Sequence, residues 1–387
     1  MMGGVYMEND DEEDCIFFGN PCERTISREA GNWHQTYGDM PMLALVAEQN
    51  KEAVRLLQKS CAENKVTLYG AMFPGLIEQG RIVEQGMCLL PLPGATRGYL
   101  SGPLDSEHAV EHLVTWLNGQ EETDEQKKKR KTLFLIFDAM VSNVGTILED
   151  MYGKLGDQYA YAGVNAGSNT LTSQPCLIEN NQFAEGRVLA LLLPISDGGI
   201  LEHGYCELDE NVLAAASEGN LIHTINWRPA LSEYRKLVYE SFGIEITRDN
   251  FYDYAVHYPF GILRANGELL VRIPSEFTRE GGIYCVGEVP PNSILQVLDA
   301  PAESLLKGVQ RLADRLRALC WTKTLIFYCT GRFMHLGDQG STNELEVLNQ
   351  VTGPCHGALS LGEIGITGKD QYPLFHNATI VALRCAP

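Results

Sequence analysis

The stretch TLFLIFDAMVSNVGTILEDMYGKLGDQYAYAGVNAGSN, residues 132–169, holds the pattern that decides the fold. Its apolar run at 133–137 has no helical period, which is typical of a buried strand. A polar hinge follows, with Ser142 or Asn143 as the N-cap of an amphipathic helix. A second strand at 159–162 then enters a glycine-rich turn that starts at Gly163. We therefore predict a strand–helix–strand unit that ends in a turn.

The same order of elements occurs twice more along the chain. One copy begins with LALVA, residues 43–47, and the other with LIFY, residues 325–328. In the last copy Ser341 and Glu344 have the spacing of a capping box at a helix start. A further apolar strand follows each copy. The sequence thus predicts an internal repeat, and an α/β fold with mixed sheets built from repeated strand–helix–strand–strand units.

Composition narrows the classes of protein to which the chain can belong. A formal charge of −20 argues against a nucleic-acid binder, because a polyanion would be repelled. The 11 cysteines show neither a C-x-x-C pair nor a zinc-type spacing, so we expect reduced thiols and no metal site. There is no secretory h-region, and no apolar run approaches the ~20 residues of a membrane span. We expect a cytoplasmic protein without membrane insertion.

The predicted elements divide the chain of 387 residues into three parts. Residues 1–40 form a polar N-terminal lead-in, residues 41–257 a first domain and residues 258–387 a second. The boundary precedes a predicted hairpin, YPFGILRANGELLVRI.

Polar residues at the ends of predicted strands are the candidate ligand-binding residues. Asp138 ends the first quoted strand, Arg332 follows CTG, and Glu363 comes directly after Gly362 in LSLGEIG. The turn at Gly163 can bring backbone N–H groups close to a ligand. In open α/β folds, ligands bind beyond the carboxyl ends of strands. Arg332 and Glu363 could hold a small polar ligand or form a structural ion pair, and both alternatives stay open.

Cysteine chemistry provides an enzyme hypothesis. Cys329, Cys355 and His356 could supply a thiol nucleophile and a base, but no activating third group accompanies them. We therefore expect no catalysis, with a thiol-dependent enzyme as the alternative. A scaffold for another protein, which would bind no ligand, is a third possibility.

Several motifs resemble those of a known family. YAGVNAGSN, QPCLIENN and HGYCELDENVLAAASEGN are similar to a FIST N domain, and CTGR and HGALSLGEIG to a FIST C domain. This family, named for F-box and intracellular signal transduction proteins, comprises sensory modules that bind small ligands, with amino acids suggested for some members. The resemblance implies a two-domain architecture, with FIST N over residues 41–257 and FIST C over residues 258–387.

The closest resemblance is to bacterial haem-binding proteins that sense nitric oxide. QPCLIENN and the pair His203-Gly204, followed by SEGN and PAL, carry it. It implies that His203 is an axial haem ligand, and that the chain regulates a partner histidine kinase or cyclic-di-GMP enzyme. The alternative sensor binds a small molecule such as an amino acid through Arg332 and Glu363, without haem.

Overall fold

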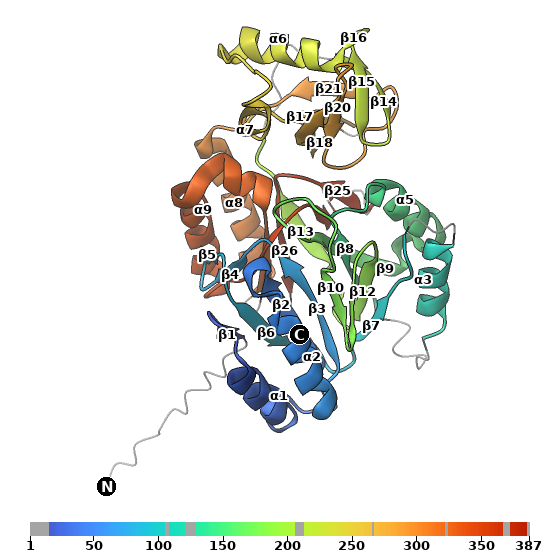
Figure 1. Cartoon of the computed structure of the whole chain (residues 1–387), viewed down its shortest axis with the longest axis vertical. Coiled ribbons are helices and arrows are strands. Elements are labelled where there is room, and N and C mark those ends of the chain that lie inside the picture. Colours follow the sequence, from blue (N-terminus) through green and yellow to red (C-terminus); the bar gives the residue numbers. More distant parts are fainter. Residues whose placement is uncertain are drawn as a thin grey trace.

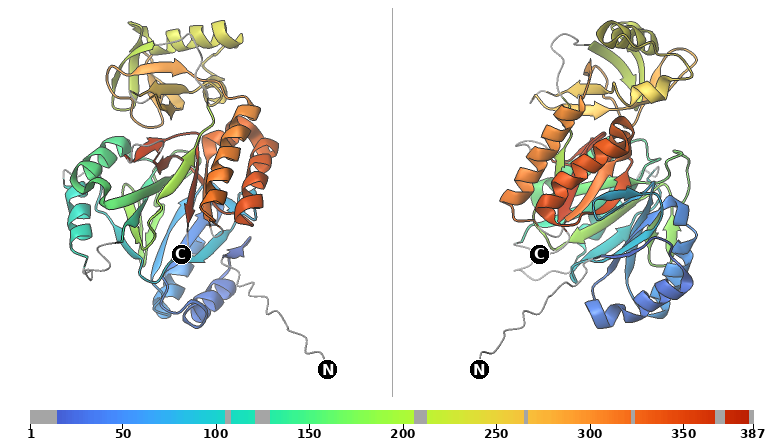
Figure 2. Two further views of the ribbon diagram at one scale, coloured as in Figure 1. Left: turned by 180° about the vertical axis from the view of Figure 1, so that it is seen from behind. Right: turned by 90° about the vertical axis from the view of Figure 1, so that its left-hand side faces the viewer.

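Three mixed six-stranded sheets form the body of the protein, and a smaller β domain lies at one end of it (Figures 1 and 2). We call these parts the body and the upper domain. The computed structural model describes residues 15–104, 108–120, 129–205, 213–264, 267–321, 324–366 and 372–384. Within these residues, no helix combines the length and the apolar character needed to cross a membrane.

Three repeats with the same order of elements build the body. The first contains β1 (Ile16–Phe18), α1 (Glu23–Tyr37), β2 (Met42–Ala47), α2 (Ala53–Glu63), β3 (Leu68–Phe73), β4 (Leu76–Glu78), β5 (Arg81–Val83) and β6 (Met87–Pro91). The second contains β7 (Arg97–Leu100), α3 (Ala109–Asn118), β8 (Lys131–Asp138), α5 (Val144–Leu155), β9 (Tyr159–Ala166), β10 (Leu177–Glu179), β11 (Gln182–Ala184) and β12 (Val188–Leu193). The third contains β13 (Gly199–Glu202), α8 (Ala302–Ala318), β22 (Thr324–Cys329), α9 (Thr330–Thr352), β23 (His356–Ser360), β24 (Glu363–Gly365), β25 (Leu374–His376) and β26 (Ile380–Arg384). The predicted internal repeat is confirmed, and each copy is longer than expected by a leading strand and helix and by a hairpin.

The upper domain is inserted into the third repeat, between β13 and α8. Its elements are β14 (Leu213–Glu218), β15 (Leu221–Ile225), β16 (Arg228–Pro229), α6 (Ala230–Phe242), α7 (Phe251–Ala255), β17 (Phe260–Leu263), β18 (Leu269–Arg272), β19 (Pro274–Phe277), β20 (Ile283–Cys285) and β21 (Ile294–Val297). The strands form one sheet in the order β18-β17-β21-β14-β15-β20-β19, with β16 beside β15. Residue 258, at which the sequence predicts a domain boundary, lies inside this domain, directly before β17.

The hairpin of each repeat joins the sheet of another repeat. In every repeat the two strands around the second helix are parallel, and the last strand of the repeat pairs antiparallel with the first of the two. Strand β4 pairs with β23, β10 pairs with β3, and β24 pairs with β9. The sheets therefore have the orders β1-β6-β2-β3-β10-β11, β25-β24-β9-β8-β12-β7 and β13-β26-β22-β23-β4-β5. The exchange is cyclic, because each repeat gives one hairpin and receives one.

The inner faces of the three sheets share one apolar core. Phe327 of the third repeat packs against Phe73 of the first and Phe134 of the second, with ring centroids 5.9 and 5.7 Å apart. The outer faces are covered by helices, α1 and α2 on the first sheet, α3 and α5 on the second and α8 and α9 on the third (Figure 2). Strands buried on both faces have no polar alternation, which explains the continuous apolar runs of the sequence.

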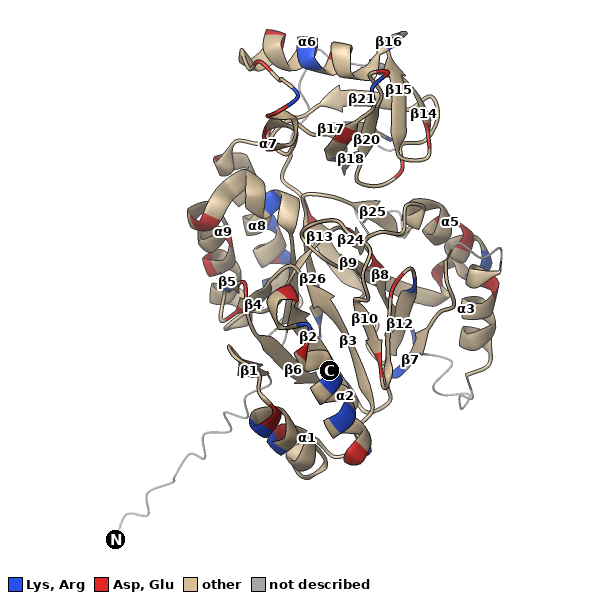
Figure 3. Cartoon of the chain, in the orientation of Figure 1, with Lys and Arg blue, Asp and Glu red and all other residues tan. Residues whose placement is uncertain are grey.

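Two predicted segments differ in the structure. The predicted turn at Gly163 is strand, because β9 continues to Ala166. Of the polar lead-in, residues 16–37 contain β1 and α1, and Trp33 of α1 is buried against α2, with its indole N–H donating to the Met40 carbonyl at 2.7 Å. Helix α1, like α6, carries both acidic and basic residues (Figure 3).

One pair of cysteines departs from the expected reduced state. The structure joins Cys15 and Cys88 in a disulfide between the residue before β1 and strand β6. Cys22, Cys61, Cys176, Cys285, Cys320, Cys329 and Cys355 are free. The two bonded residues lie 73 positions apart, so no local spacing in the sequence indicates the pair.

Candidate functional site

Four consecutive residues, the last residue of β25 and the three that precede β26 (residues 376–379), connect several elements through hydrogen bonds. The Ala378 N–H donates to Cys329 Sγ at 3.1 Å, and Asn377 Oδ1 accepts from the Ile273 N–H of the upper domain at 3.4 Å. Thr379 Oγ1 donates to Glu363 Oε2 at 2.5 Å. We call residues 376–379 the hub turn. It lies beside the carboxyl end of β22, where the sequence predicts a ligand site.

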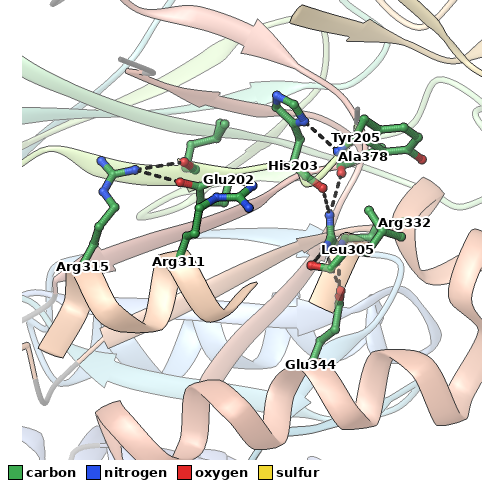
Figure 4. A network of polar contacts seen from close by, with 10 residues as sticks. Glu202, His203, Tyr205, Leu305, Arg311, Arg315, Arg332, Glu344 and Ala378 are labelled. Atoms are coloured by element: carbon green, nitrogen blue, oxygen red, sulfur yellow. Dashed lines mark hydrogen bonds and ion pairs between the residues drawn. The ribbon is translucent and has the colours of Figure 1, made fainter. Parts of the chain in front are cut away.

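Arg332 is saturated by the protein itself (Figure 4). Its Nε and Nη2 donate to the two carboxylate oxygens of Glu344 at 2.8 and 2.6 Å. The remaining three N–H groups donate to the carbonyl oxygens of His203, Ala378 and Leu305. A guanidinium has five N–H donors, so none is left for a ligand. These contacts favour the structural ion pair among the two alternatives, with Glu344 as the carboxylate in place of Glu363.

A break in α9 brings Arg332 and Glu344 together. Gly337 has φ 67° and ψ −175°, a conformation that is essentially restricted to glycine. In an unbroken helix two residues separated by twelve positions would lie about 18 Å apart along the axis. The predicted capping box is wrong, because Ser341 Oγ donates back to the Gly337 carbonyl at 2.8 Å while Glu344 pairs with Arg332.

Glu363 is fully buried and is held by hydroxyl groups. Ser360 Oγ donates to its Oε1 at 2.6 Å, and Thr379 donates to its other oxygen. Burial raises the pKa of Glu363 to about 7 despite these hydrogen bonds. His376 lies opposite Glu363 in the β24–β25 register, and both of its buried ring nitrogens lack a hydrogen-bond partner. Burial, followed by the charges of nearby groups, lowers the pKa of His376 well below its ordinary value, so the imidazole is neutral.

His203 follows β13 and does not fit an axial haem ligand in this conformation. Burial, then the charges of Arg332 and Arg311, lower its pKa to about 4, so the imidazole is neutral. The Tyr205 N–H donates to His203 Nδ1 at 3.0 Å. This hydrogen bond places the ring proton on Nε2, which leaves neither nitrogen with a free lone pair for iron.

The other predicted residues have local structural contacts. The carboxylate of Asp138, at the end of β8, accepts hydrogen bonds from the N–H groups of Met140 at 2.9 Å and Gly186 at 2.6 Å. Gly362 leaves room for the ring of Phe375, since a Cβ at Gly362 would lie 2.4 Å from it. The structure thus brings Arg332, Glu363 and the His203 carbonyl around the hub turn, whereas Asp138 ends β8, two strands away from Glu363 on the same sheet.

Gly163 belongs to a set of equivalent glycines, one in each repeat. A Cβ at Gly163 would lie 2.6 Å from the Leu135 carbonyl oxygen on the neighbouring parallel strand. The corresponding distances are 2.3 Å for Gly70 and 1.8 Å for Gly357. Close approach of the parallel strands therefore accounts for this glycine without a ligand.

A cavity of about 350 Å³ lies between the upper domain and the body. Residues of α5 and the start of β25 form its wall on the body, and residues of β18 and the segment after β20 form the other wall. Leu148, Leu270 and Phe375 make part of the lining apolar, while two acidic and two basic residues bring charge to it: Glu149, Glu288, Arg264 and Arg272. None of the residues predicted to bind ligand lines this cavity, although Gly362 supports its Phe375 wall.

Arg272 is the buried cation of this cavity, and it is only 3% exposed. Its Nε donates to the Glu288 carbonyl at 2.8 Å, and Nη1 donates to the carbonyls of Val271 and Phe375 at 2.9 and 3.0 Å. No described residue accepts a hydrogen bond from Nη2, and no described carboxylate forms an ion pair with the group. Burial lowers the pKa of Arg272 to about 10, so it remains a cation at neutral pH. Sequence reasoning missed Arg272, although an arginine inside the apolar strand LLVRI is a detectable signal.

Two hydrogen-bonded contacts beside the cavity join the upper domain to the body. One is the hydrogen bond from Arg272 to the Phe375 carbonyl. In the other, the carboxylate of Glu288 accepts from the Thr146 N–H at 3.0 Å and from Thr146 Oγ1 at 2.5 Å. This places a negative charge at the N-terminus of α5, where the helix dipole stabilises it.

The two cysteines of the enzyme hypothesis are buried. Burial raises the pKa of Cys329 far above its ordinary value and that of Cys355 to about 11. A thiol reacts as its thiolate, so both groups are poor nucleophiles in this conformation. His356, beside Cys355 in the chain, contacts Glu78 through Nδ1 at 2.9 Å.

Comparison with known protein families matches two models. The FIST N domain model matches residues 42–228, and the FIST C domain model matches residues 230–366. A search of the curated proteins finds no match for this chain. FIST domains are associated with sensory signal transduction and with the binding of small ligands. Since the two models together span most of the chain, this protein belongs to the FIST domain family.

Proposed function

We propose that this chain is a sensory protein that binds a small carboxylate-bearing molecule, of the amino-acid type, in the cavity between the upper domain and the body. The buried guanidinium of Arg272, which lines this cavity and has no acceptor for Nη2 among the described residues, carries the proposal. Its hydrogen bonds go only to backbone carbonyls, so no described carboxylate neutralises the buried positive charge. A ligand carboxylate offers this group the charged acceptor that the protein lacks.

The rest of the cavity matches the other parts of an amino acid. Glu149 of α5 provides a carboxylate for an ammonium group, and Leu148 and Leu270 provide apolar surface for a side chain. A volume of about 350 Å³ is at the lower end of the range for small-molecule sites, which suits a ligand of this size.

The position of the cavity suggests how binding becomes a signal. The hydrogen bond of Arg272 to Phe375 and that of Glu288 to Thr146 both join the upper domain to the body beside the ligand. A ligand that binds more tightly to one arrangement of these contacts shifts the protein towards that arrangement. The partner that responds is, by family resemblance, a histidine kinase or a cyclic-di-GMP enzyme.

A thermal-shift screen with amino acids and small carboxylic acids tests the proposal. A ligand at 100 times its Kd should stabilise the wild-type protein by about 2.7 kcal/mol. Arg272→Gln should lose this effect. Glu149→Gln should weaken binding of amino acids but not of the matching acids without an amino group. Arg228→Gln, which removes an exposed arginine of the same domain, is the control.

Two outcomes would contradict the proposal. One is a wild-type protein that none of these compounds stabilises. The other is an Arg272→Gln protein that is folded by circular dichroism and binds the ligand with unchanged affinity.

The second candidate function is haem-based sensing of nitric oxide, with His203 as the ligand of the iron. It rests on the family resemblance alone. An absorption spectrum of protein expressed with added haem separates the two versions. A Soret band that shifts with nitric oxide and disappears in His203→Ala would favour haem. A colourless protein that responds to amino acids would favour the cavity of Arg272.

A further inference from the structure

Three residues that can bind a metal meet between the first and third repeats, where the two cysteines belong to the shared core. Cys15 precedes β1, Cys88 lies in β6, and His356 is the first residue of β23. One ligand atom from each residue lies within 4.8 Å of those of the other two. The elements come from opposite ends of the chain, so only the closed arrangement of the three sheets brings them together.

The contact of His356 with Glu78 leaves Nε2 available for coordination. His356 Nδ1 lies 2.9 Å from Glu78 Oε2, and a carboxylate can only accept a hydrogen bond. The ring proton therefore lies on Nδ1, and Nε2 keeps its lone pair. Carboxylate–histidine pairs of this kind fix the tautomer and orientation of histidines that bind zinc.

We propose that Cys15, Cys88 and His356 bind a zinc ion when the two thiols are reduced. Two thiolates and an imidazole are ligands that zinc prefers. Bonds of about 2.3 Å to sulfur and about 2.0 Å to nitrogen place the ligand atoms of one zinc ion within the observed 4.8 Å limit. The ion displaces one proton from each thiol and takes water as its fourth ligand, since the protein supplies three.

The metal and the disulfide exclude each other, because both use the sulfur atoms of Cys15 and Cys88. In a reducing compartment, disulfides are rare, and thiolates are available for a metal. Bound zinc would then fasten β1, an edge strand of three residues, to β6 and to the third repeat. The site is thus a second function of the fold, separate from the ligand cavity.

Zinc content per chain is the direct test. The full-length protein is reduced with a phosphine, loaded with zinc chloride, freed of loose metal by gel filtration and measured by inductively coupled plasma mass spectrometry. We expect about one zinc ion per wild-type chain and a loss of this ion in Cys88→Ser and His356→Ala. Cys61→Ser removes a buried thiol elsewhere in the first repeat and should keep the ion.

A second kind of variant distinguishes a loss of zinc binding from a loss of the fold. Glu78→Gln keeps all three ligands and should weaken zinc binding by about 10–100-fold in competition with a chelator. Its circular dichroism spectrum should match that of the wild type. Zinc-free wild-type protein after reduction and loading would overturn the proposal. Equal zinc in all variants, or a Cys15–Cys88 disulfide that persists under the phosphine, would overturn it too.

Discussion

Two buried arginines, Arg272 and Arg332, differ in the acceptors that surround their guanidinium groups. Arg332 donates all five N–H groups to the protein, two of them to a carboxylate. Among the described residues Arg272 donates only to backbone carbonyls, none of them through Nη2, and it lines a cavity. A buried cation with unused donors favours an anionic ligand, whereas a saturated one stabilises the fold.

The buried carboxyl group of Glu363 predicts how the stability of the protein depends on pH. Its pKa is about 7 in the folded protein against an ordinary value of 4.5. Between these values the unfolded chain has lost a proton that the native protein keeps. The Glu363 contribution to the free energy of unfolding therefore falls as pH rises through this window, by up to about 3 kcal/mol at ~1.4 kcal/mol per pH unit.

Urea unfolding of wild type and Glu363→Gln at several pH values isolates this contribution. The stability difference, wild type minus variant, should fall from pH 5 to pH 7 and stay constant above pH 8. Both proteins share His203, whose pKa of about 4 makes stability rise with pH below 6.5, so its effect cancels. Glu346→Gln is the control for loss of a negative charge. A stability difference that does not change with pH would refute the raised pKa.

At the scale of elements, the parallel strand pairs depend on one glycine each. Gly163→Ala would place a Cβ 2.6 Å from the Leu135 carbonyl oxygen and 2.9 Å from Ile364 Cδ1. Overpacking of this kind costs about 1–3 kcal/mol. Gly153→Ala in α5 is the matched control, since nothing lies within 4 Å of its Cβ position, and alanine there should stabilise the helix by about 1 kcal/mol.

Chemical denaturation of the two alanine variants measures both effects. If Gly163→Ala proved as stable as the wild type, the close approach of the strands would not explain why a glycine occupies this position. The predicted role of its backbone in ligand binding would then be favoured.

At the scale of the whole molecule, the upper domain is held to the body by few polar contacts. Glu288→Ala removes the two hydrogen bonds to Thr146 and the negative charge at the N-terminus of α5. The loss is worth about 1 kcal/mol. We expect amide exchange in the first turn of α5 to rise roughly fivefold, as measured by hydrogen–deuterium exchange.

Glu280→Ala, on the exposed turn between β19 and β20, is the control for a loss of charge in the upper domain. Unchanged exchange in Glu288→Ala would mean that the Glu288–Thr146 contact does not help to hold the two parts together.

The repeated strand–helix–strand units of this architecture can be predicted from the sequence, whereas the exchange of hairpins between repeats cannot. Apolar runs and a helix of similar spacing predict the strand–helix–strand unit three times, since they depend on neighbours in the chain. The pairing of β4 with β23 joins residues 280 positions apart, and no local pattern specifies it. The sequence also predicts Arg332, with its glycine neighbour, as the ligand-binding arginine instead of Arg272. This choice cannot be made from the sequence, because only the folded protein determines which guanidinium is saturated with hydrogen bonds.

The cyclic exchange of hairpins has a consequence for how the body loses its structure. A linear array of repeats unravels from its ends, because the terminal repeat contacts one neighbour only. Here the chain closes into a ring in which every repeat completes the sheet of another. Release of any one repeat uncovers unpaired strand edges in the other two and opens the shared core. The body therefore has no weakest end, and its three repeats unfold together as one cooperative unit.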